Sequence, residues 1–63
     1  MTLKTILTVI DGLPHVYMYN HKTYKAVYFD PPFSDEVLKL KVEELYSDAG
    51  LNVVLKWNKN LAK

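Results

Sequence analysis

The chain has 63 residues and no cysteine, and this combination restricts its fold more than any other feature. A chain of this length buries roughly 60% of the surface of its unfolded form, so marginal stability is expected. Small domains often gain stability from disulfides or thiolate metal sites, and neither is open to this sequence. We therefore expect a single small domain over residues 1–63 that folds around one hydrophobic core, with association as a further source of stability.

The apolar pattern predicts four strands and one helix in the order β-β-β-α-β. Residues 3–10 are rich in β-branched and apolar side chains, so they are predicted to form the first strand. Residues 15–20 and 23–29 alternate between apolar and polar side chains and are predicted to form the next two. The two prolines at residues 31–32 must then leave the sheet, because proline has no backbone N–H to donate.

A helix is predicted over residues 34–49, and a final strand over 51–57. Ser34 is a good N-cap, and Gly50 is the expected C-terminal stop. Between them, apolar residues follow at helical spacing, namely Leu38, Val42, Leu45 and Ala49. We expect a small α+β domain, in which one helix packs on one face of a four-stranded mixed sheet. The final strand is expected to lie parallel beside the first, and a place beside the third strand is the alternative.

Strand parity predicts which side chains share each face of the sheet. The face under the helix is expected to be aliphatic, with Val16 and Met18 opposite Val27 and Phe29, and with Val53 and Leu55 from the final strand. The opposite face is expected to carry four tyrosines with an isoleucine and a histidine beside them: Tyr17, Tyr19, Tyr24, Tyr28, Ile6 and His15. In the expected register Tyr19 faces Tyr24. One helix covers only one face, and monomers rarely expose such a large apolar patch without a function.

We predict that the protein is a small non-enzymatic interaction module, an adaptor or inhibitor of the kind that phages and other mobile elements often encode. The tyrosine-rich face would bind a protein partner or form a homodimer, because tyrosine is enriched in the cores of protein interfaces. The candidate partner-binding residues are Tyr17, Tyr19, Tyr24, Tyr28, Ile6 and His15. The simpler interpretation is that the tyrosines only stabilise the hairpin, by ~0.2–1 kcal/mol for each cross-strand pair.

Single-stranded nucleic acid is the alternative partner, with the tyrosines as stacking platforms and nearby lysines as phosphate contacts. The lysines in question are Lys4, Lys22, Lys25 and Lys56. The net charge of +1 and the absence of arginine weigh against this hypothesis. Charge is also unevenly distributed, since residues 30–48 are acidic and both flanking segments are basic. A locally basic face is therefore all that the sequence allows.

Groups suited to catalysis or metal binding are sparse. His15 and His21 are the only imidazoles, their side chains are not expected to converge, and no Ser-His-acid set is visible. We therefore expect no enzyme activity, metal or cofactor. No apolar run approaches the ~20 residues of a membrane span, and the first ten residues lack the pattern of a signal peptide. A cytoplasmic protein without a membrane partner is the expectation.

Overall fold

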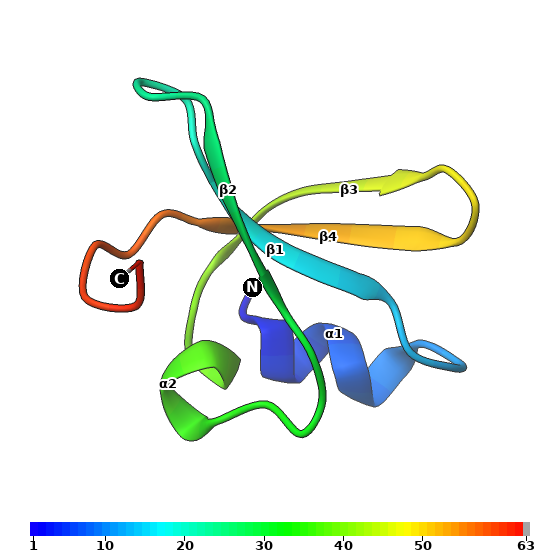
Figure 1. Ribbon diagram of the computed structural model, residues 1–63. Helices are drawn as coiled ribbons and strands as arrows, with labels where there is room; N and C mark the ends of the chain where they lie inside the picture. The colour runs from blue at the N-terminus through cyan, green and yellow to red at the C-terminus, as the bar shows by residue number, and fades with distance from the viewer. Residues whose placement is uncertain (63) are drawn as a thin grey trace.

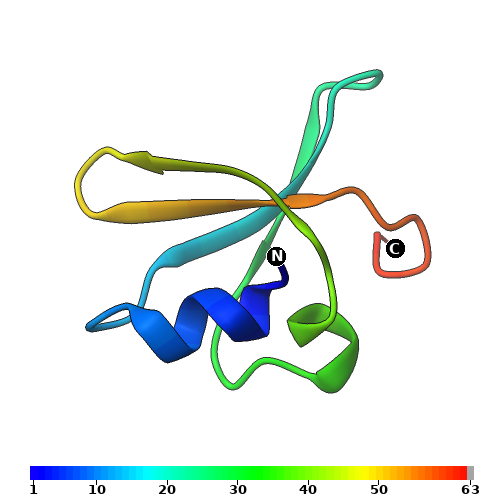
Figure 2. The same ribbon diagram turned by 180° about the vertical axis from the view of Figure 1, so that it is seen from behind.

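The computed structural model describes residues 1–62, in which a four-stranded mixed sheet carries two helices on one side (Figures 1 and 2). The elements follow the order α1 (Leu3–Val9), β1 (His15–Asn20), β2 (Lys25–Phe29), α2 (Asp35–Leu38), β3 (Val42–Ser47) and β4 (Leu51–Lys56). The strand order is β2-β1-β4-β3, with β1 and β4 parallel and both outer pairs antiparallel. The predicted α+β class and four-stranded mixed sheet are confirmed, although the order of elements along the chain differs from β-β-β-α-β.

The first element is helix α1, so the strand predicted for this segment is wrong. Thr2 Oγ1 accepts a hydrogen bond from the Thr5 N–H at 3.4 Å and caps the first helical turn. Leu3 and Ile6 lie one turn apart and are buried in the core, whereas Lys4 between them is exposed. The β-branched content favours a strand, but the helical spacing of the apolar side chains prevails. Because this segment lies on the sheet, the final strand pairs in parallel with β1 instead.

Helix α2 begins where the sequence predicts it and ends much earlier. Ser34 Oγ accepts a hydrogen bond from the Val37 N–H at 3.3 Å, which confirms the predicted N-cap. The helix ends at Leu38, so the predicted helix over residues 34–49 is wrong beyond this point. Val37 is its buried residue and contributes to the core cluster beneath the sheet.

A β-bulge in β3 explains why this strand is mistaken for a helix. The register shifts between Val42 and Glu44, so Glu43 is one extra residue without a partner in β4. Val42 and Leu45 therefore both pair with core residues of β4 although they are three positions apart. Three-residue spacing normally indicates a helix, and the bulge produces the same spacing in a strand.

The hairpin between β3 and β4 requires the left-handed backbone region. Ala49 and Gly50 have φ angles of 52° and 110°, so the glycine predicted to end a helix lies in this turn instead. The side-chain amide of Asn52 donates hydrogen bonds to the carbonyl oxygens of Asp48 at 3.0 Å and Gly50 at 3.2 Å. A buried amide therefore fixes the turn that connects the two strands.

The core lies between the helices and the face of the sheet that parity predicts to be aliphatic. Its buried cluster consists of Leu3, Ile6, Val16, Met18, Val37, Val53 and Leu55. Val27 and Phe29 from β2 and Trp57 after β4 pack partly buried against it. The predicted division of β1, β2 and β4 into two faces is confirmed, and the side of the sheet away from the helices is left open (Figures 1 and 2).

Candidate functional site

The open side of the sheet presents a row of aromatic side chains from three strands. Strand register brings ten residues to this side, which we call the tyrosine face: His15, Tyr17, Tyr19, Ala26, Tyr28, Glu44, Tyr46, Asn52, Val54 and Lys56. Among residues 1–62, both helices lie on the opposite side, as the two ribbon views show (Figures 1 and 2). The tyrosine face is therefore defined by backbone pairing and has no helix over it.

Tyr17 is the centre of this face and contacts two other tyrosines. Its ring packs against that of Tyr28, directly opposite on β2, with ring centroids 4.9 Å apart and planes tilted by 38°. Its hydroxyl forms a hydrogen bond of 2.7 Å with the hydroxyl of Tyr46. Tyr46 lies on β3, so this bond spans the intervening strand β4. Together with the ring contact to Tyr28, it makes Tyr17 a link between the two outer strands.

The bond between Tyr17 and Tyr46 also accounts for burial on an otherwise open face. Val54 of β4 is opposite Tyr17 and is buried although no helix covers it. The two tyrosines reach toward each other over β4, so their rings shield this valine from water. Tyr17 and Tyr46 are partly buried, whereas Tyr28 at the outer strand is 69% exposed.

The environment of Tyr17 raises its pKa from 10.0 to about 12. The hydrogen bond with Tyr46 is the largest cause, followed by desolvation of the phenol. The nearby Tyr46 and Tyr28 phenols and the Glu44 carboxylate add unfavourable charge interactions with a tyrosinate. The Tyr17 hydroxyl therefore stays neutral and hydrogen-bonded well above neutral pH.

The structure places four of the six predicted site residues together and separates two. Tyr17, Tyr19, Tyr28 and His15 lie on the tyrosine face as expected. Ile6 does not, because it belongs to α1 and is 3% exposed in the core on the other side of the sheet. Tyr46 also belongs to the face, although it falls within the segment predicted as a helix, because the bulge hides the strand pattern.

The register of the β1–β2 hairpin also differs from the expectation. Tyr17 pairs with Tyr28 and Tyr19 with Ala26, a shift of two residues that leaves every side chain on its predicted face. The predicted pairing of Tyr19 with Tyr24 is wrong, because Tyr24 lies in the turn with a φ of 59°. Asn20 Oδ1 accepts hydrogen bonds from the backbone of the following turn, which lengthens the loop and shifts the pairing.

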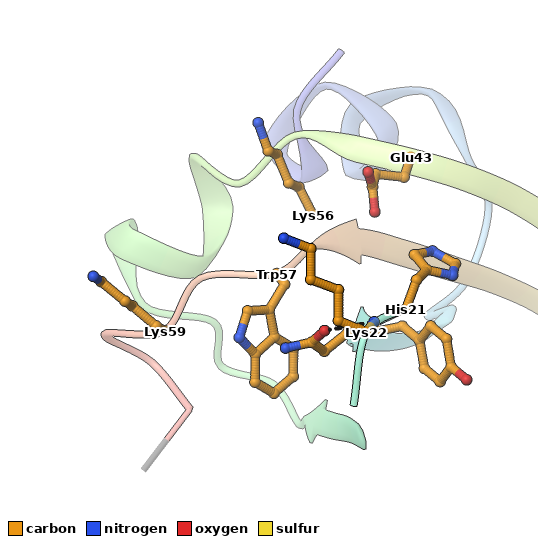
Figure 3. Close-up of a pocket in the computed structure, with 8 residues that line it drawn as sticks. His21, Lys22, Glu43, Lys56, Trp57 and Lys59 are labelled. Atoms are coloured by element: carbon orange, nitrogen blue, oxygen red, sulfur yellow. Dashed lines mark hydrogen bonds between the residues drawn. The ribbon is translucent and has the colours of Figure 1, made fainter. Parts of the chain in front are cut away.

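A groove lies where the tyrosine face meets the segment after β4. It has a volume of about 550 Å³ and is lined by Tyr19, Asn20, His21, Lys22, Glu43, Lys56, Trp57 and Lys59 (Figure 3). The His21 ring packs edge-on against Tyr19 with centroids 4.8 Å apart. The groove combines two large aromatic side chains with three lysines and a single carboxylate. The fold therefore brings Lys22 to the same groove as Lys56 and Lys59, which are far from it in the sequence.

Other kinds of site are few in the part of the chain that the structure describes. Residues 1–62 contain no group of three histidine, aspartate or glutamate side chains that could hold a metal ion. None of the helices in this range is both long and apolar enough to cross a membrane. No family model, curated protein or solved structure matches the chain.

Proposed function

We propose that this protein is a small non-enzymatic interaction module that binds a protein partner through the tyrosine face. The observation that carries the proposal is the linked cluster of Tyr17, Tyr28 and Tyr46 on a sheet side without a helix. If the tyrosines only stabilised the β1–β2 hairpin, a cross-strand pair between these two strands would be enough. This cluster instead extends from β2 to β3.

Tyrosines suit a binding surface for energetic reasons. A tyrosine offers a large amphipathic contact area and loses little conformational freedom on binding, because it has only two side-chain torsions. Tyr17 is already held by its ring contact and its hydrogen bond, so less ordering is left for the binding step. The periphery of the face carries both charge signs, with Lys56 and Glu44, which suits the polar rim of an interface.

The proposal is tested by a pull-down from the native cell with paired surface variants. Tyr28→Ser removes the most exposed tyrosine of the tyrosine face without opening the core. Val9→Ser is the matched control, because Val9 is an equally accessible apolar residue on α1, on the opposite side of the sheet. We expect the wild type and Val9→Ser to recover the same partner and Tyr28→Ser to lose it. The purified partner should then protect β1 and β2 amides from hydrogen exchange.

Two results would contradict this proposal. Equal recovery by both variants would show that the bound protein uses another surface. A partner that protects α1 and α2 from exchange, and leaves the sheet unchanged, would place the interface on the helical side. Circular dichroism of both variants before the pull-down ensures that a lost partner does not reflect a lost fold.

Single-stranded nucleic acid is a second candidate ligand, favoured by the groove. Trp57 and Tyr19 provide aromatic surfaces for stacking, and Lys22, Lys56 and Lys59 line the same space (Figure 3). The absence of arginine and the carboxylate of Glu43 in the groove oppose it. This ligand therefore ranks below a protein partner.

The fluorescence of Trp57 tests this candidate directly, because it is the chain's sole tryptophan. A single-stranded oligonucleotide that enters the groove should quench it, with a log–log salt slope of about −2 for three lysine contacts. Lys22→Gln/Lys56→Gln/Lys59→Gln should abolish this binding. The control, with the same change in net charge outside the groove, is Lys4→Gln/Lys39→Gln/Lys41→Gln. Equal weakening of binding by both triple variants would indicate non-specific electrostatic attraction. If the oligonucleotide did not quench Trp57 at either low or physiological salt, the groove would be excluded as a nucleic-acid site.

A further inference from the structure

The two outer strands of the sheet present different edges to solvent. In the described part of the chain, β2 pairs only with β1 and β3 only with β4, so each has one edge without a strand partner. Strand β3 carries two features that discourage pairing, namely the bulge at Glu43 and the adjacent carboxylates of Glu43 and Glu44. Strand β2 has neither of these features.

Strand β2 is regular and apolar along most of its length. Its five residues pair with β1 without a register shift, and every residue after Lys25 is apolar or aromatic. Ala26 and Tyr28 are exposed on the tyrosine face, and even the core-facing Val27 and Phe29 are only half-buried. A further strand beside β2 would therefore bury apolar surface on both sides of the sheet while it satisfied the free backbone groups.

We propose that the edge of β2 pairs with the same edge of a second copy of this chain, antiparallel about a two-fold axis at Val27. The strand is self-complementary in this arrangement. Val27 would lie opposite the partner subunit's Val27, and the small Ala26 would lie opposite the large ring of the partner subunit's Tyr28. No like charges face each other, because Lys25 lies opposite the partner subunit's Phe29.

This pairing would enlarge the tyrosine face without covering it. A two-fold axis perpendicular to the sheet leaves both tyrosine faces on the same side. The row formed by Tyr17 and Tyr28 in one copy would continue through the partner subunit's Ala26 and Tyr19. The inference does not rest on the proposed function, since it concerns the edge of the sheet and the pairing holds whatever binds to the face.

The dimer is expected to be weak, because the pairing strand has only five residues. An interface of this size lies at the small end of specific protein contacts, so a dissociation constant on the order of 100 µM is expected. Sedimentation equilibrium of the native chain up to about 1 mM should then show a reversible dimer. A strict monomer over that range would overturn the proposal.

A cysteine at the proposed axis tests the register, and the absence of native cysteines makes the result unambiguous. Opposed residues in an antiparallel pair have Cα atoms about 4.5–5.5 Å apart, within the range that a disulfide spans. Val27→Cys should therefore form a disulfide-linked dimer in a glutathione redox buffer. Ser47→Cys on the exposed edge of β3 is the matched control and should form at least about tenfold less, since ordinary collisions alone would link it.

A second set of cysteine variants checks the proposed register. Ala26→Cys alone should link poorly, whereas a mixture of Ala26→Cys and Tyr28→Cys should give mainly the mixed dimer, because these two positions oppose each other. Equal linkage of Val27→Cys and Ser47→Cys would refute a specific β2 edge contact. That result would leave the pull-down test of the tyrosine face unaffected, so failure of the two proposals can be distinguished.

Discussion

The two faces of the sheet carry side chains of different kinds from the same strands. On β1 and β4, the side toward the helices carries Val16, Met18, Val53 and Leu55, all buried in the core. The other side carries the partly buried Tyr17 and Tyr19 of β1 and the exposed Tyr28 of β2, with the buried Asn52 and Val54 of β4. Alternation along a strand assigns one side chain to packing and the next to the surface. Stability is therefore expected to depend mainly on one face and binding on the other.

Truncation on the core face should give the largest effect. Leu55 is 0% exposed, and Leu55→Ala should lower the free energy of unfolding by about 2–5 kcal/mol, enough to unfold much of a marginal domain. Leu45→Ala is the comparison, because Leu45 is paired in β3 yet 45% exposed and should cost less than about 1 kcal/mol. Urea unfolding followed by circular dichroism measures both. Similar losses would mean that β3 packs more tightly than its exposure indicates.

The contrast between faces is also what the sequence predicts well. Alternation identifies β1, β2 and β4 and places Tyr17, Tyr19 and Tyr28 opposite the core, because a side chain's face depends only on local parity. Even the wrong hairpin register keeps these assignments, since the shift is by an even number of residues. The half of the candidate site that lies on these strands could therefore be found from sequence alone.

The remaining errors arise where local pattern and tertiary packing favour different structures. Leu3 and Ile6 have helical spacing within a β-branched segment, and the need to cover the sheet determines the outcome. Val42 and Leu45 have helical spacing because of a bulge, and only pairing with β4 reveals it. Tyr46 is missed for the same reason. The prediction for Ile6 is wrong because a strand at this position would turn its side chain to the open side of the sheet. In helix α1 the same side chain points into the core.

A moderate effect is expected from the hydrogen bond that joins Tyr17 of the inner strand β1 to Tyr46 of the outer strand β3. Tyr46→Phe removes one hydroxyl of the 2.7 Å bond and should lower the free energy of unfolding by about 0.5–1.5 kcal/mol. Tyr17→Phe should give a similar loss, and the double variant should cost less than the two losses added together, because both remove the same interaction. Urea unfolding of the four proteins gives the coupling. Additive losses would contradict a bond that contributes to stability in solution.

The smallest effect at neutral pH, and the most specific to one group, concerns the ionisation of Tyr17. Its pKa is raised from 10.0 to about 12 in the folded chain, chiefly by the hydrogen bond with Tyr46. The neutral phenol is the form that folding stabilises, so its contribution is complete below pH 10 and is lost as pH rises from 10 to about 12. Carbon-13 NMR of the Tyr17 ring carbon that bears the hydroxyl should follow this titration directly. In Tyr46→Phe the pKa should fall toward its ordinary value, because the largest cause of the shift is removed. The loss of stability between pH 10 and about 12 should then shrink, because the pKa values of the folded and unfolded chain become nearly equal. A Tyr17 pKa that stayed at about 12 in Tyr46→Phe would assign the shift to desolvation instead, and the hydrogen bond with Tyr46 would no longer explain it.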